Sequence, residues 1–179
     1  MKNLLIVAIM IAGCTIAAKA QDKVAPSPAC TVSQTVGLTD MTVEYSRPGM
    51  KDRTIFGELV PYGKKWRAGA NSVTKFTCST DVNIGGADLK AGEYAVLVTP
   101  EKDSWTLHFY PYDGSRWTPY RDSDVKPINA TNSKFIEMPW DVESYMIFFN
   151  NLRDETATLH FVWERTNAVF QVTVPSVKG

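Results

Sequence analysis

The chain has 179 residues, with 19 Lys and Arg residues against 19 Asp and Glu residues, and its formal net charge at pH 7 is zero. This length fits one domain, either alone or preceded by a processed leader. A chain without excess positive charge is not a general nucleic-acid binder, because binding to the phosphate backbone depends on Lys and Arg.

Residues 1–20 are predicted to be a cleaved secretory signal peptide. A basic start at Lys2 precedes an apolar run over residues 4–12, and residues 18–20 (Ala-Lys-Ala) form a cleavage site. The predicted mature chain begins at Gln21. Cleavage removes Lys2 and Lys19 and no acidic residue, so 17 basic and 19 acidic residues remain, a formal net charge of −2.

A second interpretation of the leader centres on Cys14. Residues 11–14 (Ile-Ala-Gly-Cys) resemble a bacterial lipobox, which would make Cys14 a lipidated N-terminus. Simple cleavage predicts a periplasmic or secreted protein, and lipidation predicts an outer-membrane-associated lipoprotein. The apolar run is too short for a membrane span, and no later stretch supplies one.

Residues 30–179 are predicted to form a single β domain, preceded by a Pro-containing linker over residues 21–29. Short runs with alternating apolar residues, separated by turn residues, indicate strands rather than helices. The predicted strands cover residues 30–35, 41–45, 73–79, 81–84, 94–99, 105–110, 145–149, 158–164 and 169–174, with a turn at 165–167. This pattern predicts an all-β protein, an antiparallel β-sandwich or barrel-like fold of about eight to ten strands.

One long segment lacks this pattern. Residues 111–133 are polar, rich in Pro, Asp, Ser and Asn, and carry Trp117 and Tyr120. They are predicted to be a surface loop with a short edge strand near Val125. A loop of this length is more often functional or mobile than neutral.

The mature chain retains two cysteines, Cys30 and Cys78. In an oxidising compartment they can form a disulfide. Each also lies where a buried thiol is ordinary in a strand. The sequence leaves both alternatives open, because it does not give the distance between their Cα atoms.

The usual catalytic and metal-binding patterns are absent from the sequence. His108 and His160 are isolated within alternating strands, with no spacing typical of a zinc site. No nucleophile elbow, phosphate loop or dinucleotide fingerprint occurs. The sequence therefore predicts no metal site, no cofactor and no recognisable catalytic residue, so an enzymatic activity is not indicated.

Residues 45–76 differ from the rest of the chain in composition and charge. They contain seven basic residues and two acidic ones, a net charge of +5, so the rest of the mature chain carries −7. Aromatic residues and glycines are interleaved with the charges. Arginine suits carboxylate or phosphate groups and stacks on rings, while glycine lets the backbone turn tightly or approach a ligand.

Two interpretations of this segment remain open. In the first, it forms a shallow polar site for an anionic or glycan-like ligand. The predicted ligand-binding residues are Tyr45, Arg47, Arg53, Tyr62, Trp66, Arg67 and Asn71. In the second, its arginines form ion pairs with acidic residues of the C-terminal half and pin an irregular crossover onto the sandwich. The candidate acids are Glu137, Asp141, Glu143, Asp154 and Glu155.

Several ordered motifs resemble the bacterial domain-of-unknown-function family 2911, found mainly in exported proteins of the Bacteroidota. The motifs lie at residues 45–48 (Tyr-Ser-Arg-Pro), 53–57, 59–63 (Leu-Val-Pro-Tyr-Gly), 66–71, 82–86, 89–94 and 163–164 (Trp-Glu). The resemblance covers about residues 28–175 and implies an exported, mainly β domain. It departs at Ala68, where the family usually has a hydroxyl residue, and it implies no established activity or catalytic residue.

Three functions are compatible with these observations. The first is a non-enzymatic envelope protein that binds a small molecule or envelope component through residues 45–76. The second is a hydrolase of envelope glycan or lipid, with Glu44 or Glu58 beside Arg67. The third is a purely structural envelope protein.

Overall fold

The computed structural model describes residues 24–132 and 135–176. The predicted signal peptide and the lipidation candidate Cys14 lie outside the described residues.

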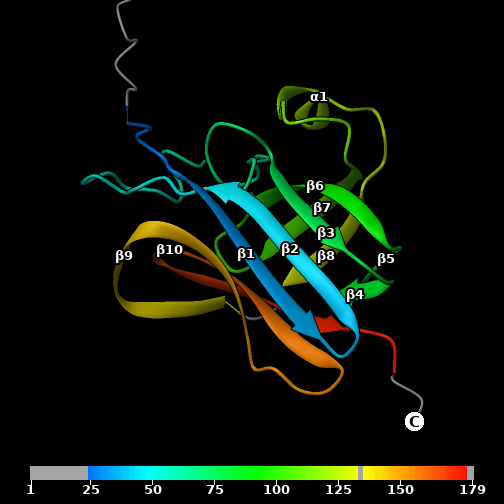
Figure 1. Ribbon diagram of the computed structural model, residues 1–179. Coiled ribbons are helices and arrows are strands. Elements are labelled where there is room, and N and C mark those ends of the chain that lie inside the picture. The colour runs from blue at the N-terminus through cyan, green and yellow to red at the C-terminus, as the bar shows by residue number, and fades with distance from the viewer. Residues whose placement is uncertain (1–23, 133–134, 177–179) are drawn as a thin grey trace, which may run out of the picture.

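Ten strands within the described residues form two antiparallel sheets that pack against each other (Figure 1). The six-stranded sheet has the order β1 (Ala29–Val36), β2 (Thr39–Ser46), β3 (Thr74–Cys78), β6 (Gly92–Pro100), β7 (Trp105–Pro111) and β8 (Ile128–Asn132). The four-stranded sheet has the order β5 (Ala87–Leu89), β4 (Val82–Ile84), β10 (Thr156–Thr173) and β9 (Phe135–Asn150). The predicted antiparallel β-sandwich is confirmed, and the two sheets do not close into a barrel.

The main core lies between the sheets and is built by the alternating positions of the strands. In β2, Met41, Val43 and Tyr45 are buried, while the residues between them are more exposed. β6 is buried on both faces because it lies in the middle of its sheet. Its Val96 and Val98 join the main core, whereas its outer face belongs to a second, smaller cluster. That outer cluster contains Val73, Ala95, Leu97, Tyr110 and Tyr120.

The segment after β7 is more ordered than predicted. It contains the short helix α1 (Thr118–Arg121), and its edge strand is β8 rather than a strand near Val125, whose side chain is exposed. The ring of Tyr120 explains this order, because it packs against Tyr110 on the outer face of the sheet. Its hydroxyl accepts a hydrogen bond from the Asp113 amide and donates one to the Gly114 carbonyl. No helix in the described part of the chain is long and apolar enough to cross a membrane.

The C-terminal strands are fewer and longer than predicted. β9 begins ten residues before the predicted start at residue 145, and β10 runs through the predicted turn at 165–167. Instead of turning, β10 bends at two register shifts on either side of Glu164. Glu164 has a φ of 53°, a left-handed conformation that is uncommon for a residue other than glycine. The bend redirects β10 toward β4 without ending the strand.

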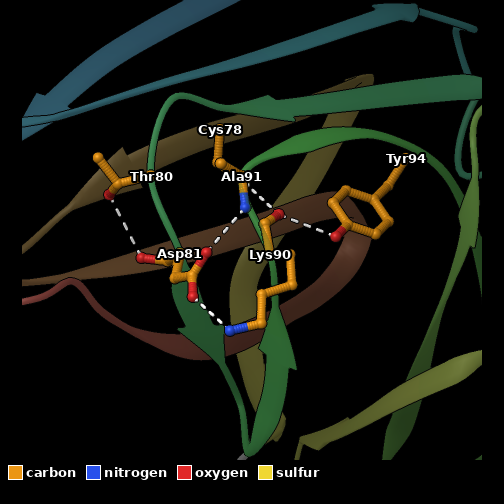
Figure 2. Close-up of polar contacts among 6 residues, drawn as sticks. All are labelled: Cys78, Thr80, Asp81, Lys90, Ala91 and Tyr94. Carbon is orange, nitrogen blue, oxygen red and sulfur yellow. Dashed lines mark hydrogen bonds and ion pairs between the residues drawn. The ribbon is translucent and has the colours of Figure 1, made fainter.

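A group of hydrogen bonds fixes the chain where it passes from β5 of one sheet to β6 of the other (Figure 2). The Asp81 carboxylate accepts hydrogen bonds from Lys90 Nζ at 2.7 Å and from the Ala91 amide at 3.0 Å. The Lys90 carbonyl accepts bonds from the Tyr94 hydroxyl at 2.8 Å and the Cys78 thiol at 3.4 Å. These bonds satisfy backbone groups at a crossing point that no strand ladder covers.

Cys30 and Cys78 are free thiols, so the disulfide that the sequence left open does not form. The reason lies in the strand register. Cys30 is opposite Tyr45 and Cys78 is opposite Met41, four residues apart on β2. That offset alone places the two cysteines about 13 Å apart along the strand direction, beyond the reach of a disulfide. Burial raises the pKa of the Cys78 thiol, which keeps it protonated and unreactive.

Candidate ligand-binding site

The basic segment between β2 and β3 is an irregular crossover. It contains no strand of the sheets, only isolated bridges such as Gly49 to Ser144 and Trp66 to Val98. Left-handed backbone conformations explain why it stays irregular. Positive φ values occur at Lys51, Asp52, Gly57, Gly63, Ala68, Gly69 and Asn71. A chain that reverses so often cannot extend a ladder, so its side chains must anchor it.

The first anchor is an aromatic cluster. The Trp66 ring stacks on Trp163 at 5.7 Å between centroids and meets Tyr145 edge-on at 5.0 Å. Phe56, also from the crossover, meets Trp105 at 5.0 Å. Aromatic pairs of this kind contribute about 0.5–1.5 kcal/mol each beyond their buried area. Trp66 therefore holds the crossover to both sheets from within the core.

Tyr45 belongs to the same cluster. Its ring meets Tyr145 edge-on, and its hydroxyl accepts a hydrogen bond from the Ile147 amide at 2.9 Å and donates to the Ile147 carbonyl at 3.3 Å. Burial raises the pKa of Tyr45 to about 12. The phenol thus joins β2 to β9 across the sandwich.

The second anchor consists of carboxylates that accept backbone N–H groups of the crossover. The Glu164 carboxylate accepts from the Ile55 amide at 3.1 Å and from the Phe56 amide at 3.2 Å. The Glu143 carboxylate accepts from the Lys51 amide at 3.1 Å. Acids of the C-terminal half therefore do pin the crossover, but through its main chain.

The predicted ion pairs of the arginines do not form. Among residues 24–132 and 135–176, no ion pair includes Arg47, Arg53 or Arg67. All three donate to backbone carbonyls instead. Arg47 Nε bonds to the Tyr145 carbonyl at 2.9 Å, and Arg67 Nη1 bonds to the Asn71 carbonyl at 2.9 Å. Arg53 donates to the carbonyls of two residues just before it, Gly49 and Met50.

At its C-terminal end the crossover meets the loop after β7. The Arg67 guanidinium lies over the Trp117 ring, 4.7 Å from its centroid, and the Arg121 guanidinium lies 4.8 Å from the same centroid. The Val73 amide donates to the Ser115 carbonyl at 2.8 Å, which joins the two segments. Partial burial lowers the pKa of Arg67, but a guanidinium stays charged at neutral pH.

Two open hollows lie along this junction. The first, of about 290 Å³, is lined by Asn71, Ser72, Ser115, Arg116, Trp117 and Thr118. The second, of about 240 Å³, shares Ser72 and Ser115 and adds Ala29, Cys30, Thr31, Glu44, Tyr45, Ser46, Val73, Lys75 and Tyr112. We call the two hollows together the junction groove. Each hollow alone is somewhat smaller than a typical small-ligand pocket of about 300–1,000 Å³, and both are open to solvent.

Only some of the predicted ligand-binding residues lie at this groove. Asn71 lines the first hollow, Arg67 borders it through Trp117, and Tyr45 contributes to the second hollow. The others lie elsewhere on the crossover and do not line it. Arg47 reaches toward β9, Arg53 bonds within its own turn, Trp66 is in the aromatic cluster, and Tyr62 packs beside Gly57.

Sequence reasoning missed the opposite wall of the groove, which Ser115, Arg116, Trp117 and Thr118 supply. The sequence feature that could have indicated this wall is the presence of Arg116 and Trp117 in a long polar loop. The hydroxyl-bearing residues gave no signal, because Ser and Thr are common in any loop.

Two residues that line the second hollow, Glu44 and Lys75, belong to an ion-pair network. Lys75 Nζ lies 2.6 Å from a Glu93 carboxylate oxygen and 3.3 Å from one of Glu44, and 5.2 Å from the centroid of the Tyr112 ring. The hydrogen bond to Glu93 is the main cause that raises the pKa of Lys75. Glu44, one of the two hydrolase candidates, is therefore engaged by Lys75, while Glu58 is exposed outside the groove.

Both histidines are held by neutral neighbours. His108 lies between the Thr99 hydroxyl at 2.8 Å and the Asn129 side-chain oxygen at 2.9 Å. His160 lies between the Thr158 hydroxyl at 2.8 Å and the Asn167 side-chain oxygen at 3.1 Å. Burial lowers the pKa of both imidazoles. Within the described residues, no carboxylate bonds to either ring. His108 links β7 to β6 and β8, whereas the hydrogen bonds of His160 stay within β10.

The described residues contain no group of three or more His, Cys, Asp or Glu side chains placed to hold a metal ion. Searches of curated proteins and of solved structures returned no match to the chain. One family model matches residues 27–172, which include all ten strands apart from the last residue of β10, and it agrees with the family that the sequence motifs resembled. The chain belongs to the family described as "Protein of unknown function (DUF2911)".

Proposed function

We propose that this protein is exported to the cell envelope and binds an anionic or glycan-like ligand in the junction groove. The observation that carries the proposal is the meeting of two hollows at Ser72 and Ser115, with Asn71, Arg116 and Trp117 in the first. Concave sites with a few convergent polar groups are the usual places for small ligands. Cationic and hydroxyl-bearing side chains suit an anion or a sugar.

The ligand part of the proposal is tested by blocking the groove. Ser115 is exposed, and its structural bond uses the backbone carbonyl, so Ser115→Trp should fill the groove without unfolding the protein. The purified full chain is screened by thermal shift against a panel of acidic and neutral oligosaccharides. We expect at least one to raise the melting temperature of the wild type and not that of Ser115→Trp.

The matched control is Asp103→Trp, at the exposed turn between β6 and β7, far along the sheet from the groove residues. It should respond to the panel as the wild type does. A panel without any stabilising compound, or one that stabilises Ser115→Trp equally, would refute ligand binding at this groove.

Export rests on the pattern of residues 1–20 and is tested separately. Mass spectrometry of the protein recovered from its producing cell should find an N-terminus at Gln21, or a lipidated Cys14 if the lipobox is used. An intact N-terminal Met1 on the mature protein would contradict export by either route.

A further inference from the structure

The junction groove contains an aromatic ring whose surroundings constrain the ligand. Trp117 is half-buried, and two guanidinium groups, from Arg67 and Arg121, lie within 5 Å of its centroid. Neutral sugars are commonly held by stacking on a bare aromatic face. The cations of this chain already engage the Trp117 ring, so the groove is poorly suited to bind a sugar by stacking alone.

The guanidinium groups around the groove differ in how many donors they have left. Arg121 is held by the Asp122 carboxylate through Nε and Nη2, both at 2.6 Å, so its charge is neutralised locally. Arg67 donates through Nη1 to the Asn71 carbonyl. The exposed Arg116 side chain takes part in no hydrogen bond or ion pair among the described residues. A guanidinium has five N–H donors, so Arg116 and the remainder of Arg67 can still bind an anion.

Hydroxyl groups line the same hollow. Within the described part of the chain, the side-chain hydroxyls of Ser72, Ser115 and Thr118 form no hydrogen bond to another residue. Among the described residues that line this hollow, none carries a carboxylate. Glu44 lines only the neighbouring one, where Lys75 holds it. The described lining of the first hollow therefore offers a positive charge and several hydroxyls, and the Asp122 carboxylate beyond Trp117 is paired with Arg121.

We propose that the ligand of the junction groove is a carboxylate-bearing saccharide of the uronic acid class. This inference rests on the proposed function and specifies its ligand. Arg116 binds the carboxylate, because a guanidinium matches a carboxylate in a two-point hydrogen bond. The hydroxyls of Ser72, Ser115 and Thr118 bind the hydroxyl groups of the sugar. Arg67 supplies positive charge from beside Trp117 and positions that ring at the edge of the hollow.

The test compares two trisaccharides that differ only in their carboxylates, trigalacturonate and galactotriose of the same linkage. Binding to the full chain is measured by isothermal titration calorimetry at one fixed ionic strength. We expect trigalacturonate to bind at least tenfold more tightly than galactotriose. Equal affinities would overturn the inference while leaving the groove as a sugar site, so the proposed function would survive.

Two arginine variants complete the test. Arg116→Gln should weaken trigalacturonate binding at least tenfold and leave the melting temperature unchanged, because Arg116 has no partner among the described residues. The control is Arg153→Gln, which changes an exposed arginine between β9 and β10. This variant should bind trigalacturonate with the affinity of the wild type. Unaltered binding in Arg116→Gln overturns the inference. Failure of the wild type to bind either trisaccharide also overturns the inference. The panel of acidic and neutral oligosaccharides then decides whether the groove binds another ligand.

Discussion

Tyr45 and Tyr145 pack edge to face, and their hydroxyl groups are in opposite situations. The Tyr45 hydroxyl is bonded to both backbone groups of Ile147. The Tyr145 ring is fully buried beside it, and within the described residues its hydroxyl has no partner. A buried polar group without a partner costs about 1–3 kcal/mol of desolvation. The core therefore contains one favourable phenol and one unfavourable phenol in direct contact.

This contrast gives a prediction for two parallel variants. Tyr145→Phe should leave the free energy of unfolding unchanged or raise it by about 1 kcal/mol, because it removes only the unpaired hydroxyl. Tyr45→Phe should lower it by about 1 kcal/mol through loss of its backbone bonds. Urea unfolding measures both. A clear loss of stability in Tyr145→Phe would mean that its hydroxyl has a partner, such as a buried water molecule.

At the scale of elements, the crossover depends on backbone groups as much as on side chains. Glu164 is the clearest case, because the bend that places it in β10 also directs its carboxylate to two amides of the crossover. The bend and the anchor are thus one feature. It explains why a charged residue adopts a conformation that normally favours glycine.

We expect Glu164→Ala to lower the free energy of unfolding by about 1.5–3 kcal/mol, the range for hydrogen bonds to charged groups. The variant should also expose the aromatic cluster under the crossover, which tryptophan fluorescence would report as a red shift. The control is Glu137→Ala, since Glu137 is exposed and, among the described residues, forms an ion pair only with Arg165 on the surface. Similar losses in both variants would contradict the anchoring role of Glu164.

The bonds at the β5-to-β6 crossing should make stability depend on acid pH. Lys90 holds the pKa of Asp81 below its ordinary value. The ionised Asp81 carboxylate therefore stabilises the folded state fully at pH values above the pKa of an unfolded Asp, about 3.9. This stabilisation is lost as the pH falls through the lower pKa of the folded state. We expect wild type to lose more stability than Asp81→Asn between pH 5 and pH 3 in urea unfolding. Parallel pH profiles would rule out this contribution.

At the scale of the whole molecule, the aromatic cluster joins three parts that are distant in sequence. Trp66 comes from the crossover, Trp105 from the six-stranded sheet and Trp163 from the four-stranded sheet. Because Trp66 contacts both other rings, displacement of any one of the three would disrupt the packing of the cluster. The sandwich and its crossover should therefore behave as one cooperative unit.

We expect a single unfolding transition in urea, with coincident midpoints from tryptophan fluorescence and from far-ultraviolet circular dichroism. The change in fluorescence comes mainly from Trp66, Trp105 and Trp163, because Trp140 is already exposed in the folded protein. Circular dichroism reports the sheets. A fluorescence midpoint at lower urea concentration would show that the crossover detaches first and that the sheets are stable without it.

Alternation along the strands was enough to predict the sandwich, because residues such as Met41, Val43 and Tyr45 face the core in the order that β2 imposes. It failed at Glu164, where a long-range contact with the crossover bends β10 instead of ending it. Alternation also did not predict the groove, because the contact between Arg67 and Trp117 depends on how β3, β6 and β7 pair in the sheet. Local sequence patterns carry no information on contacts between residues that are distant in sequence.

The backbone partners of the arginines have a consequence for how this family can vary. A carbonyl is present whichever amino acid occupies the position, so replacing the side chain there does not remove it. Arg47 and Arg67 bind carbonyls of Tyr145 and Asn71. We therefore expect that substitutions of acids in the C-terminal half that do not bind the crossover's amides leave the hydrogen bonds of Arg47 and Arg67 intact.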